Sequence, residues 1–122
     1  MDNYAVSYYV PQLPQQSFKV IEYTSQQKEW QAYLKALTTE KEYEVLNCLA
    51  THESRWQQKW NYMYVVNPQK YTAYGIFQIL ESTARGVDPT LDRKDPHQNI
   101  ELAVKLYRSS GKSPWLVAPL CP

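Results

Sequence analysis

Glu53 is the residue that the sequence places best for acid–base chemistry. Leu46, Leu49 and Ala50 lie seven, four and three residues before it, so on a helix all four side chains share one face. An apolar surface disfavours the charged form of a carboxyl group and raises its pKa. A glutamate in that setting stays protonated near neutral pH and can donate a proton to a leaving oxygen. Glu53 is therefore a candidate general acid.

The plainer alternative for Glu53 is a solvated carboxylate paired with Arg55 or Lys59. A second segment, residues 73–79, reads Ala-Tyr-Gly-Ile-Phe-Gln-Ile and alternates apolar residues around one amide, Gln78. An amide buried between apolar side chains needs hydrogen-bond partners. On the residues alone, Gln78 could simply tie a loop to a helix.

Two helices are predicted to position Glu53. The first, over residues 25–37, has its apolar residues at helical spacing: Trp30, Tyr33, Leu34 and Leu37. Thr39 with Glu42 three residues later forms a capping box that starts the second helix. The apolar stripe of this second helix leads to Glu53 and consists of Tyr43, Leu46, Leu49 and Ala50.

Two further helices are predicted downstream. Residues 81–85 indicate a short helix that is closed by Gly86. At the start of the last helix Asp95 caps, Pro96 takes the first helical position and Gln98 completes a capping box. The buried stripe of this last helix consists of Ile100, Ala103, Val104 and Tyr107.

Length and composition set the class of protein. The chain has 122 residues, of which 43% are hydrophobic, and this fits one domain with a single core. Its net charge of +1 gives no electrostatic field that would attract nucleic acid. No segment approaches the roughly 18 consecutive apolar residues of a membrane span. We expect a mainly α domain over residues 25–122 and an extended arm or linker over residues 1–24, whose prolines disfavour helix and central strand.

The cysteines and histidines match no known metal or redox motif. His52 and His97 have neither His-x-x-x-His spacing nor a carboxylate cluster, so no metal or other cofactor is expected. A Ser-His-Asp site is equally unsupported, because there is no Gly-x-Ser-x-Gly elbow. A bridge from Cys48 to Cys121 would pin the C-terminal tail against the helix that carries Glu53. The alternative is two unrelated thiols.

The motif at residues 51–55, Thr-His-Glu-Ser-Arg, pairs with residues 73–79 in a way that resembles soluble lytic transglycosylases and goose-type lysozymes, with their Glu-Ser and Gly-Leu-Met-Gln-Ile motifs. Residues 95–100 are similar to the Asp-Pro-x-x-Asn-Ile segment of the same family. In that segment we assign Asp95 and Asn99 to folding. The resemblance covers residues 43–117 and implies a mainly α, lysozyme-like fold with a small β or loop element.

The chain departs from the family pattern at two places. Gln69 stands where transglycosylases often have a serine, six residues before the motif glycine, and the later Tyr-Asn-Ala-Gly segment is missing. Residues 111–115, Gly-Lys-Ser-Pro-Trp, stand near its place. This ending is more similar to small exported lysozyme-like proteins that finish in Pro-Trp and a cysteine.

The resemblance implies an enzyme that cleaves the β-1,4 bond between MurNAc and GlcNAc in peptidoglycan, with Glu53 as its single catalytic carboxyl group. No second acidic residue has an obvious place in the site, and this favours a substrate-assisted lytic transglycosylase. The close alternative is a goose-type hydrolase. A third is a catalytically inactive module that binds peptidoglycan or has a structural role.

The resemblance also places Gln78 in the saccharide groove, near the acid. Aromatic residues close to the motifs in sequence are expected to contact sugar rings: Tyr62, Tyr64, Tyr71, Tyr74 and Trp115. Of these, Tyr74 and Trp115 should be partly exposed beside Glu53. Trp30 should lie outside the groove.

Peptidoglycan strands are the expected partner, which implies an extracytoplasmic location: secreted, periplasmic or virion-associated. Residues 1–4 lack the charged-then-apolar plan of a secretory signal. Either such a signal has been removed, or export does not use one, as for an enzyme of a phage virion or cell-envelope assembly. Outside the cytoplasm a disulfide would persist.

Overall fold

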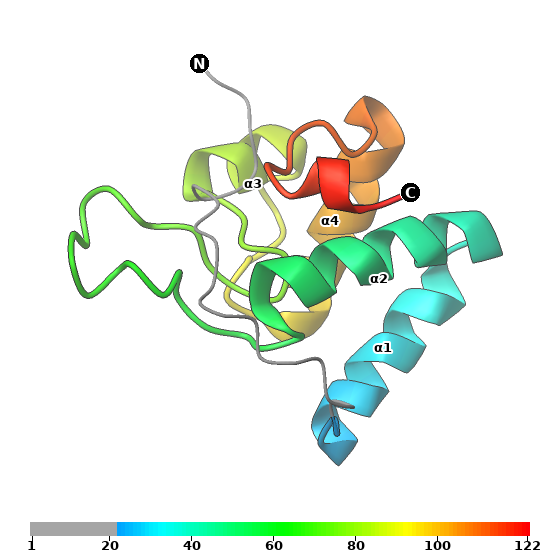
Figure 1. The fold of residues 1–122 in the computed structure, drawn as a ribbon. Helices are drawn as coiled ribbons and strands as arrows, with labels where there is room; N and C mark the ends of the chain where they lie inside the picture. Colours follow the sequence, from blue (N-terminus) through cyan, green and yellow to red (C-terminus); the bar gives the residue numbers. More distant parts are fainter. Residues whose placement is uncertain (1–21) are drawn as a thin grey trace.

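The computed structural model describes residues 22–122, and the fold in this part of the chain is mainly α, as predicted. Its elements in chain order are α1 (Ser25–Leu37), α2 (Glu40–Ser54), α3 (Glu81–Val87), α4 (Pro96–Ser110) and the short 3-10 helix η1 (Ala118–Leu120). The helix α4 contacts α1, α2 and α3. A long loop between α2 and α3 extends to one side of the helices (Figure 1).

Capping boxes start the first two helices. At α2 the Thr39 hydroxyl accepts from the Glu42 backbone N–H at 3.1 Å, and the Glu42 carboxylate accepts from the Thr39 N–H at 3.0 Å. An equivalent box between Thr24 and Gln27 starts α1. Each cap contributes on the order of 1 kcal/mol, because it satisfies backbone donors that the helix leaves unpaired. The predicted bounds of α1 and the predicted start of α2 are confirmed.

Two predictions about helix ends are wrong, one at the end of α3 and one at the start of α4. Gly86 does not close α3, because the helix continues to Val87 and is capped by Asp88. A glycine inside a helix costs only about 1 kcal/mol relative to alanine and does not break it. At α4, Asp95 caps as predicted, but Gln98 does not complete the box, since its Oε1 accepts from the Asp92 N–H at 2.6 Å.

The core lies where α1, α2 and α4 meet residues 76–79. Its largest fully buried side chains include Trp56, Trp115, Phe77, Leu34, Leu46, Leu49, Ile76, Ile79, Ile100 and Leu102. Phe77 makes edge-to-face contacts with Trp56 and Trp115, at ring-centroid distances of 6.1 and 6.3 Å. The predicted apolar stripe of α2 before Glu53 is confirmed, because Leu46, Leu49 and Ala50 are all 0% exposed.

The loop region contains the small β element in the form of isolated bridges. Tyr74 pairs with Trp60 on one side and with Ile79 on the other, both antiparallel. Within residues 22–122, no helix is long and apolar enough to cross a membrane. The arm predicted over residues 1–24 falls largely outside the described residues, which begin at Glu22, so the domain boundary stays a prediction.

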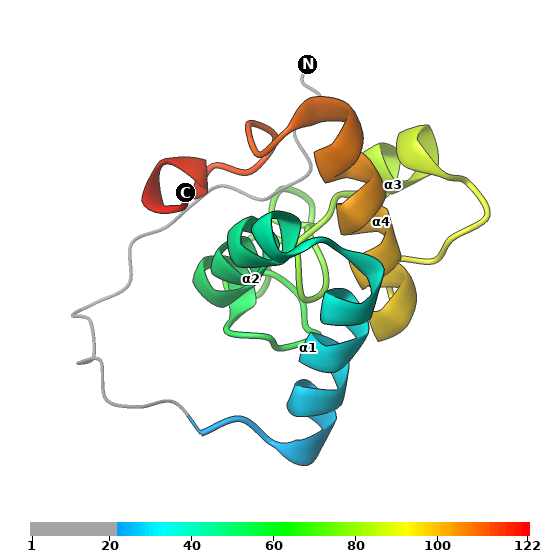
Figure 2. The same ribbon diagram turned by 90° about the vertical axis from the view of Figure 1, so that its right-hand side faces the viewer.

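The two cysteines form a disulfide, so the alternative of two unrelated thiols is wrong. Cys48 of α2 is bonded to Cys121, which follows η1, and their Cα atoms are 5.7 Å apart. The C-terminal segment therefore lies beside α2, as two perpendicular views show (Figures 1 and 2). Within that segment, the Lys112 ammonium donates to the Cys121 carbonyl at 2.6 Å.

Replacing both cysteines with serine should lower the free energy of unfolding by about 4 kcal/mol in the chain-entropy model, because the bridge closes a loop with a sequence separation of 73. Urea unfolding of the native protein and the double variant measures this difference. Alkylation of the unreduced native protein, followed by intact-mass measurement, is the control. Two freely reacting thiols in that control would contradict the bridge.

Candidate active site

Glu53 lies in the last turn of α2, next to an unusual helix end. Arg55 and Trp56 follow with φ angles of 56° and 61°, two consecutive residues in the left-handed region. For a residue other than glycine this backbone conformation costs about 1–3 kcal/mol, so it persists only where the surrounding structure holds it in place. Here the Trp56 ring is fully buried, and its Nε1 donates to Asn47 at 2.9 Å. The turn directs the chain away just after Glu53.

The carboxyl group of Glu53 is desolvated. Within residues 22–122, its Oε2 is the one buried side-chain oxygen or nitrogen without a hydrogen-bond partner. Burial raises the pKa of Glu53 well above its ordinary value of 4.5. Arg55 and Lys59, by contrast, are exposed. The predicted apolar setting of Glu53 is therefore present, and the alternative of a solvated carboxylate is not what the structure shows.

The segment of residues 74–79 packs directly against the end of α2. The hydroxyl of Ser54, the neighbour of Glu53, donates to the Ile76 carbonyl at 2.8 Å. From the C-terminal segment, the Trp115 indole N–H donates to the Phe77 carbonyl at 3.1 Å. Side chains from distant elements thus hold this loop beside the acid.

Asn99 of α4 is bonded to the backbone of this loop through both ends of its side-chain amide. Its Oδ1 accepts from the Phe77 N–H at 2.9 Å, and its Nδ2 donates to the carbonyls of Tyr74 and Arg93 at 3.0 and 2.9 Å. Asn99 is fully buried. The structure agrees with its assignment to folding.

Gly75 fits this arrangement because it has no Cβ. Its φ of 93° lies in the region that favours glycine, and a Cβ there would come within 2.1 Å of the Asn99 amide nitrogen and 2.8 Å of Gln58 Oε1. Gln58 is held in place as well, because its Oε1 accepts from the Ile76 N–H at 2.9 Å. The glycine of the motif is therefore a packing requirement.

Gln78 is 2% exposed, and its amide nitrogen donates to the carbonyls of Lys59 and Gly75 at 3.0 and 2.9 Å. It therefore ties the loop of residues 74–79 to the loop that follows α2. The sequence left open a structural role in which Gln78 ties a loop to a helix; the structure shows a structural role, but one that joins two loops. A direct contact between Gln78 and a sugar stays a prediction.

Glu53 and this loop lie in a region of the sequence that is similar to a known protein family. The sequence model of one family, described as Transglycosylase SLT domain, matches residues 28–114, which is more than half of the chain. The chain belongs to this family. Comparisons with curated proteins and with solved structures gave no match. The matched range contains Glu53, the loop of residues 74–79 and Asn99, and it supports peptidoglycan degradation of the lytic transglycosylase type.

Trp115, which directly follows the matched range, corrects a prediction about the groove. We expected it to be partly exposed beside Glu53, but it is 1% exposed and packs in the core with its N–H bonded to Phe77. A side chain so enclosed cannot stack on a sugar ring. Its large apolar surface is instead buried in the core, where the ring packs against Phe77.

Two of the predicted groove tyrosines are brought together by Trp60, a residue that the sequence did not single out as a site residue. The Trp60 ring stacks on Tyr64 at a centroid distance of 4.3 Å and meets Tyr74 edge to face at 4.8 Å. The ammonium of Lys94 lies 4.9 Å above Trp60. Tyr74 is partly exposed, as expected. Contact of these rings with sugars stays a prediction.

The other two predicted tyrosines lie on the same long loop of the SLT domain. Tyr62 is 48% exposed and Tyr71 is partly buried. Their role in binding substrate stays a prediction.

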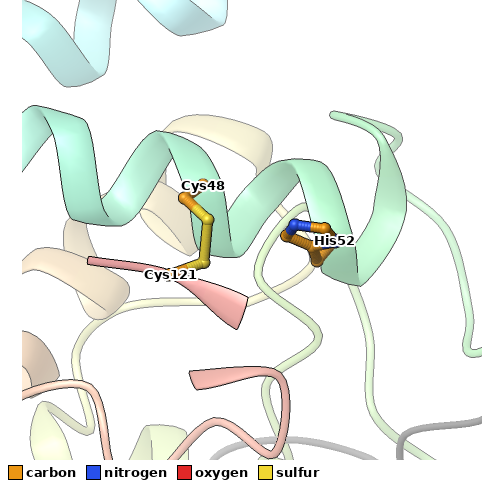
Figure 3. A group of neighbouring side chains, drawn as sticks. All are labelled: Cys48, His52 and Cys121. Carbon is orange, nitrogen blue, oxygen red and sulfur yellow. A yellow bond between two sulfur atoms is a disulfide. The ribbon is translucent and has the colours of Figure 1, made fainter. Parts of the chain in front are cut away.

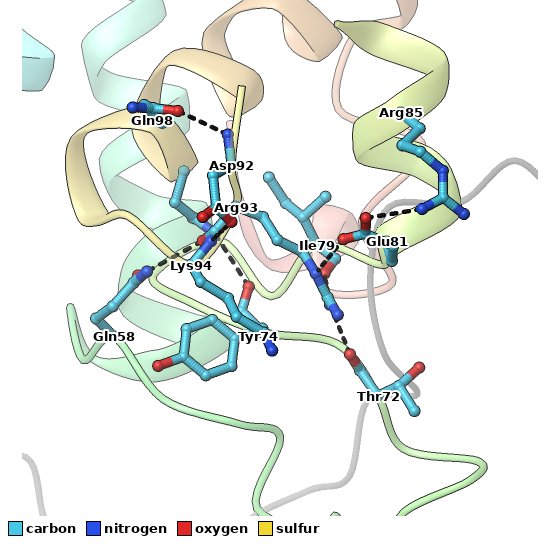
Figure 4. Close-up of polar contacts among 11 residues, drawn as sticks. Gln58, Thr72, Tyr74, Ile79, Glu81, Arg85, Asp92, Arg93, Lys94 and Gln98 are labelled. Atoms are coloured by element: carbon cyan, nitrogen blue, oxygen red, sulfur yellow. Dashed lines mark hydrogen bonds and ion pairs between the residues drawn. The ribbon is translucent and has the colours of Figure 1, made fainter. Parts of the chain in front are cut away.

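Arg93 is a second residue that the sequence did not single out. It is 5% exposed, and its Nη1 donates to the carbonyls of Thr72 and Ile79, both at 2.6 Å (Figure 4). Its Nε donates to Glu81 at 3.0 Å. Burial lowers the pKa of Arg93, and the neighbouring Glu81 opposes that shift. Arg93 thus joins both ends of the loop that packs beside Glu53.

One group in residues 22–122 brings metal-ligand atoms close together: Cys48, His52 and Cys121. The two sulfurs are bonded to each other, so they offer no thiolate to a metal.

Stability as a function of pH tests the burial of Glu53 without an activity assay. Below about pH 4.5 the carboxyl group is protonated in both the folded and the unfolded SLT domain. As the pH rises further, only the unfolded state ionises, so the native protein loses about 1.4 kcal/mol per pH unit until the raised pKa is reached. Glu53→Gln cannot titrate, so it should gain stability over the native protein across this window.

Chemical unfolding of both proteins between about pH 4 and pH 8 measures this difference. Glu44→Gln, on an exposed position of the same helix, is the matched control and should follow the native protein. A stability difference between native protein and Glu53→Gln that does not change with pH would contradict the raised pKa.

Proposed function

We propose that the chain is a lytic transglycosylase in which Glu53 protonates the glycosidic oxygen between MurNAc and GlcNAc. The observation that carries this proposal is the buried, unpartnered Oε2 of Glu53. Desolvation raises the pKa of the carboxyl group well above its ordinary value, which favours the protonated form that can donate a proton. Within residues 22–122 no hydrogen-bond donor contacts this oxygen, so none stabilises the charged form of the carboxyl group there.

The nucleophile is proposed to come from the substrate. Most glycosidases use a second carboxylate, but the three aspartates nearest the motif in sequence are used elsewhere. Asp88 binds Lys105 at 3.1 Å and Thr90, Asp92 accepts from the Lys94 N–H at 2.9 Å, and Asp95 caps α4.

In the substrate-assisted route, the C6 hydroxyl of MurNAc attacks the anomeric carbon once Glu53 has protonated the leaving oxygen. The Glu53 carboxylate formed in that step then takes the hydroxyl proton. The sugar product carries a 1,6-anhydro ring, and Glu53 returns to its protonated form. One carboxyl group therefore serves as acid and then as base.

Product analysis tests this proposal. Purified peptidoglycan is digested with the native protein, Glu53→Gln and Glu44→Gln, and the fragments are identified by mass spectrometry. Anhydro ends with the native protein and Glu44→Gln, and none with Glu53→Gln, would support the proposal. Reducing ends would instead indicate a goose-type hydrolase. Sedimentation with peptidoglycan in the absence of cleavage would indicate a binding module.

The location of the protein follows from its substrate. Peptidoglycan lies outside the cytoplasm, and we infer that the chain acts there, as a secreted, periplasmic or virion-associated protein. The Cys48–Cys121 bridge supports this inference, because disulfides persist in oxidising compartments and are rare in the cytosol.

A further inference from the structure

A histidine lies beside the disulfide, outside the site described above. Cys48 and His52 are four residues apart on α2, so they occupy the same face of the helix one turn apart. The two sulfurs and the nearest ring nitrogen of His52 all lie within 4.8 Å of one another. Figure 3 shows the imidazole next to the bridge, on the side of α2 that faces the C-terminal segment.

The bridge can be approached from the side of the histidine. His52 is exposed and Cys48 is partly exposed, whereas Cys121 is only 7% exposed. An incoming thiol therefore reaches Cys48 beside the imidazole, and Cys121 is the sulfur that leaves. Partial burial lowers the pKa of His52, so the ring is neutral near neutral pH and has a nitrogen free to accept a proton.

We propose that the Cys48–Cys121 bridge is a site of thiol–disulfide exchange, in which His52 carries the proton. The partner is a dithiol, either a small reductant or a dithiol–disulfide oxidoreductase. The proposal rests on the contacts of the bridge and is independent of the proposed function.

The exchange takes place in two steps. In the first, the imidazole takes the proton of a partner thiol as its sulfur attacks Cys48 Sγ. The bond between the bridge sulfurs breaks, its electron pair goes to Cys121 Sγ, and the imidazolium returns the proton to that thiolate. In the second step, the other partner thiol attacks the mixed disulfide and releases Cys48 as a thiol. The partner is oxidised to a disulfide, and the bridge is reduced to two thiols.

The exchange has a structural consequence for the C-terminal segment. The bridge is its covalent link to α2, and it joins that helix five residues before Glu53. The hydrogen bond from Lys112 to Cys121 lies within the segment itself and does not replace the link. Reduction therefore leaves the segment attached to the body by non-covalent packing, such as that of Trp115 and Val117 in the core.

A purely structural role for His52 makes a different prediction. The residue lies in the last turn of α2, where an imidazolium would interact favourably with the helix dipole. In that role its removal would destabilise the helix end, open the bridge more often and speed up reduction. A base for the exchange does the opposite, because its removal slows reduction.

The rate of reduction by excess dithiothreitol separates these roles. Native protein, His52→Gln and His97→Gln are incubated under native conditions, quenched by alkylation and analysed by intact mass. We expect His52→Gln to be reduced about tenfold more slowly, below the 10²–10⁴-fold of an enclosed acid–base group because the site is open to water. His97, on α4 and paired with Glu29 at 2.9 Å, is the matched control, and its variant should react like the native protein.

A second measurement uses His52→Ala, which leaves space for a small base. Free imidazole in solution should accelerate reduction of this variant more than that of the native protein. Unfolding midpoints of all variants are measured in parallel, and a loss of stability cannot produce a slower rate. Equal or faster reduction of His52→Gln, or equal acceleration by imidazole, would overturn the proposal.

Discussion

Glu53→Gln should lower the rate of peptidoglycan cleavage by about 10²–10⁴-fold, the contribution of a positioned general acid, or by more. The glutamine keeps the size of the side chain but has no proton to donate. In the native protein, the rate should fall as the pH rises through the raised pKa of Glu53, since the carboxyl group is then ionised before it meets the substrate. Dye release from labelled peptidoglycan, followed across pH, measures both effects.

The control for this experiment is Glu44→Gln, an exposed carboxylate of α2 that should leave the rate unchanged. Circular dichroism confirms that both variants are folded. Near-native cleavage by Glu53→Gln would rule out Glu53 as the acid and, with it, the proposed mechanism.

Asn99→Leu should cost about 4 kcal/mol of folding stability, the largest loss that we expect from a single substitution. Leucine has a similar volume, but it leaves the Phe77 N–H without its partner, and a buried group left unsatisfied costs about 1–3 kcal/mol. The carbonyls of Tyr74 and Arg93 keep the Ile79 N–H and the Gln58 amide as donors, so each loses one hydrogen bond of about 1 kcal/mol. That sum is a large part of the total stability of a domain of this size.

Urea unfolding followed by circular dichroism measures this loss. Asn67→Ala is the matched control, because Asn67 also accepts from two backbone N–H groups, those of Gln69 and Lys70, but lies on the surface. Water replaces those bonds, so we expect a loss of about 1 kcal/mol or less. A similar small loss for both variants would show that the Asn99 contacts do not hold the loop.

The helices could be predicted because their signals are local. The capping box at Thr39 and the apolar spacing before Glu53 each lie within a few residues, and short-range geometry decides them. The buried setting of the Glu53 carboxyl group followed from the same pattern, because a carboxyl group that continues an apolar stripe lies at the edge of the core. The bridge between Cys48 and Cys121 could be named from the sequence but not decided, since pairing depends on how distant segments meet.

The roles of Trp115, Gln78 and Arg93 could not be predicted in this way. The side chain of each donates to a backbone carbonyl. Every residue has such a carbonyl, so the sequence does not indicate which one a side chain will bind. An aromatic side chain near a motif is equally compatible with a groove and with a core. Trp115 lies in the core, where its ring packs against Phe77 and where the disulfide links the segment that carries it to α2.

The loop of residues 74–79 also has a consequence for the order of folding. Its hydrogen bonds reach to Ser54 and Asn99 across 22 residues and to Trp115 across 38, so none forms until distant parts of the chain have come together. Contacts of long sequence separation are slow to form, because they require the closure of large loops. Until then, Glu53 is an ordinary glutamate at the end of a helix. In the proposed mechanism, the acid would therefore arise only when assembly is complete, and an unfinished chain would have no means of cleaving the polymer.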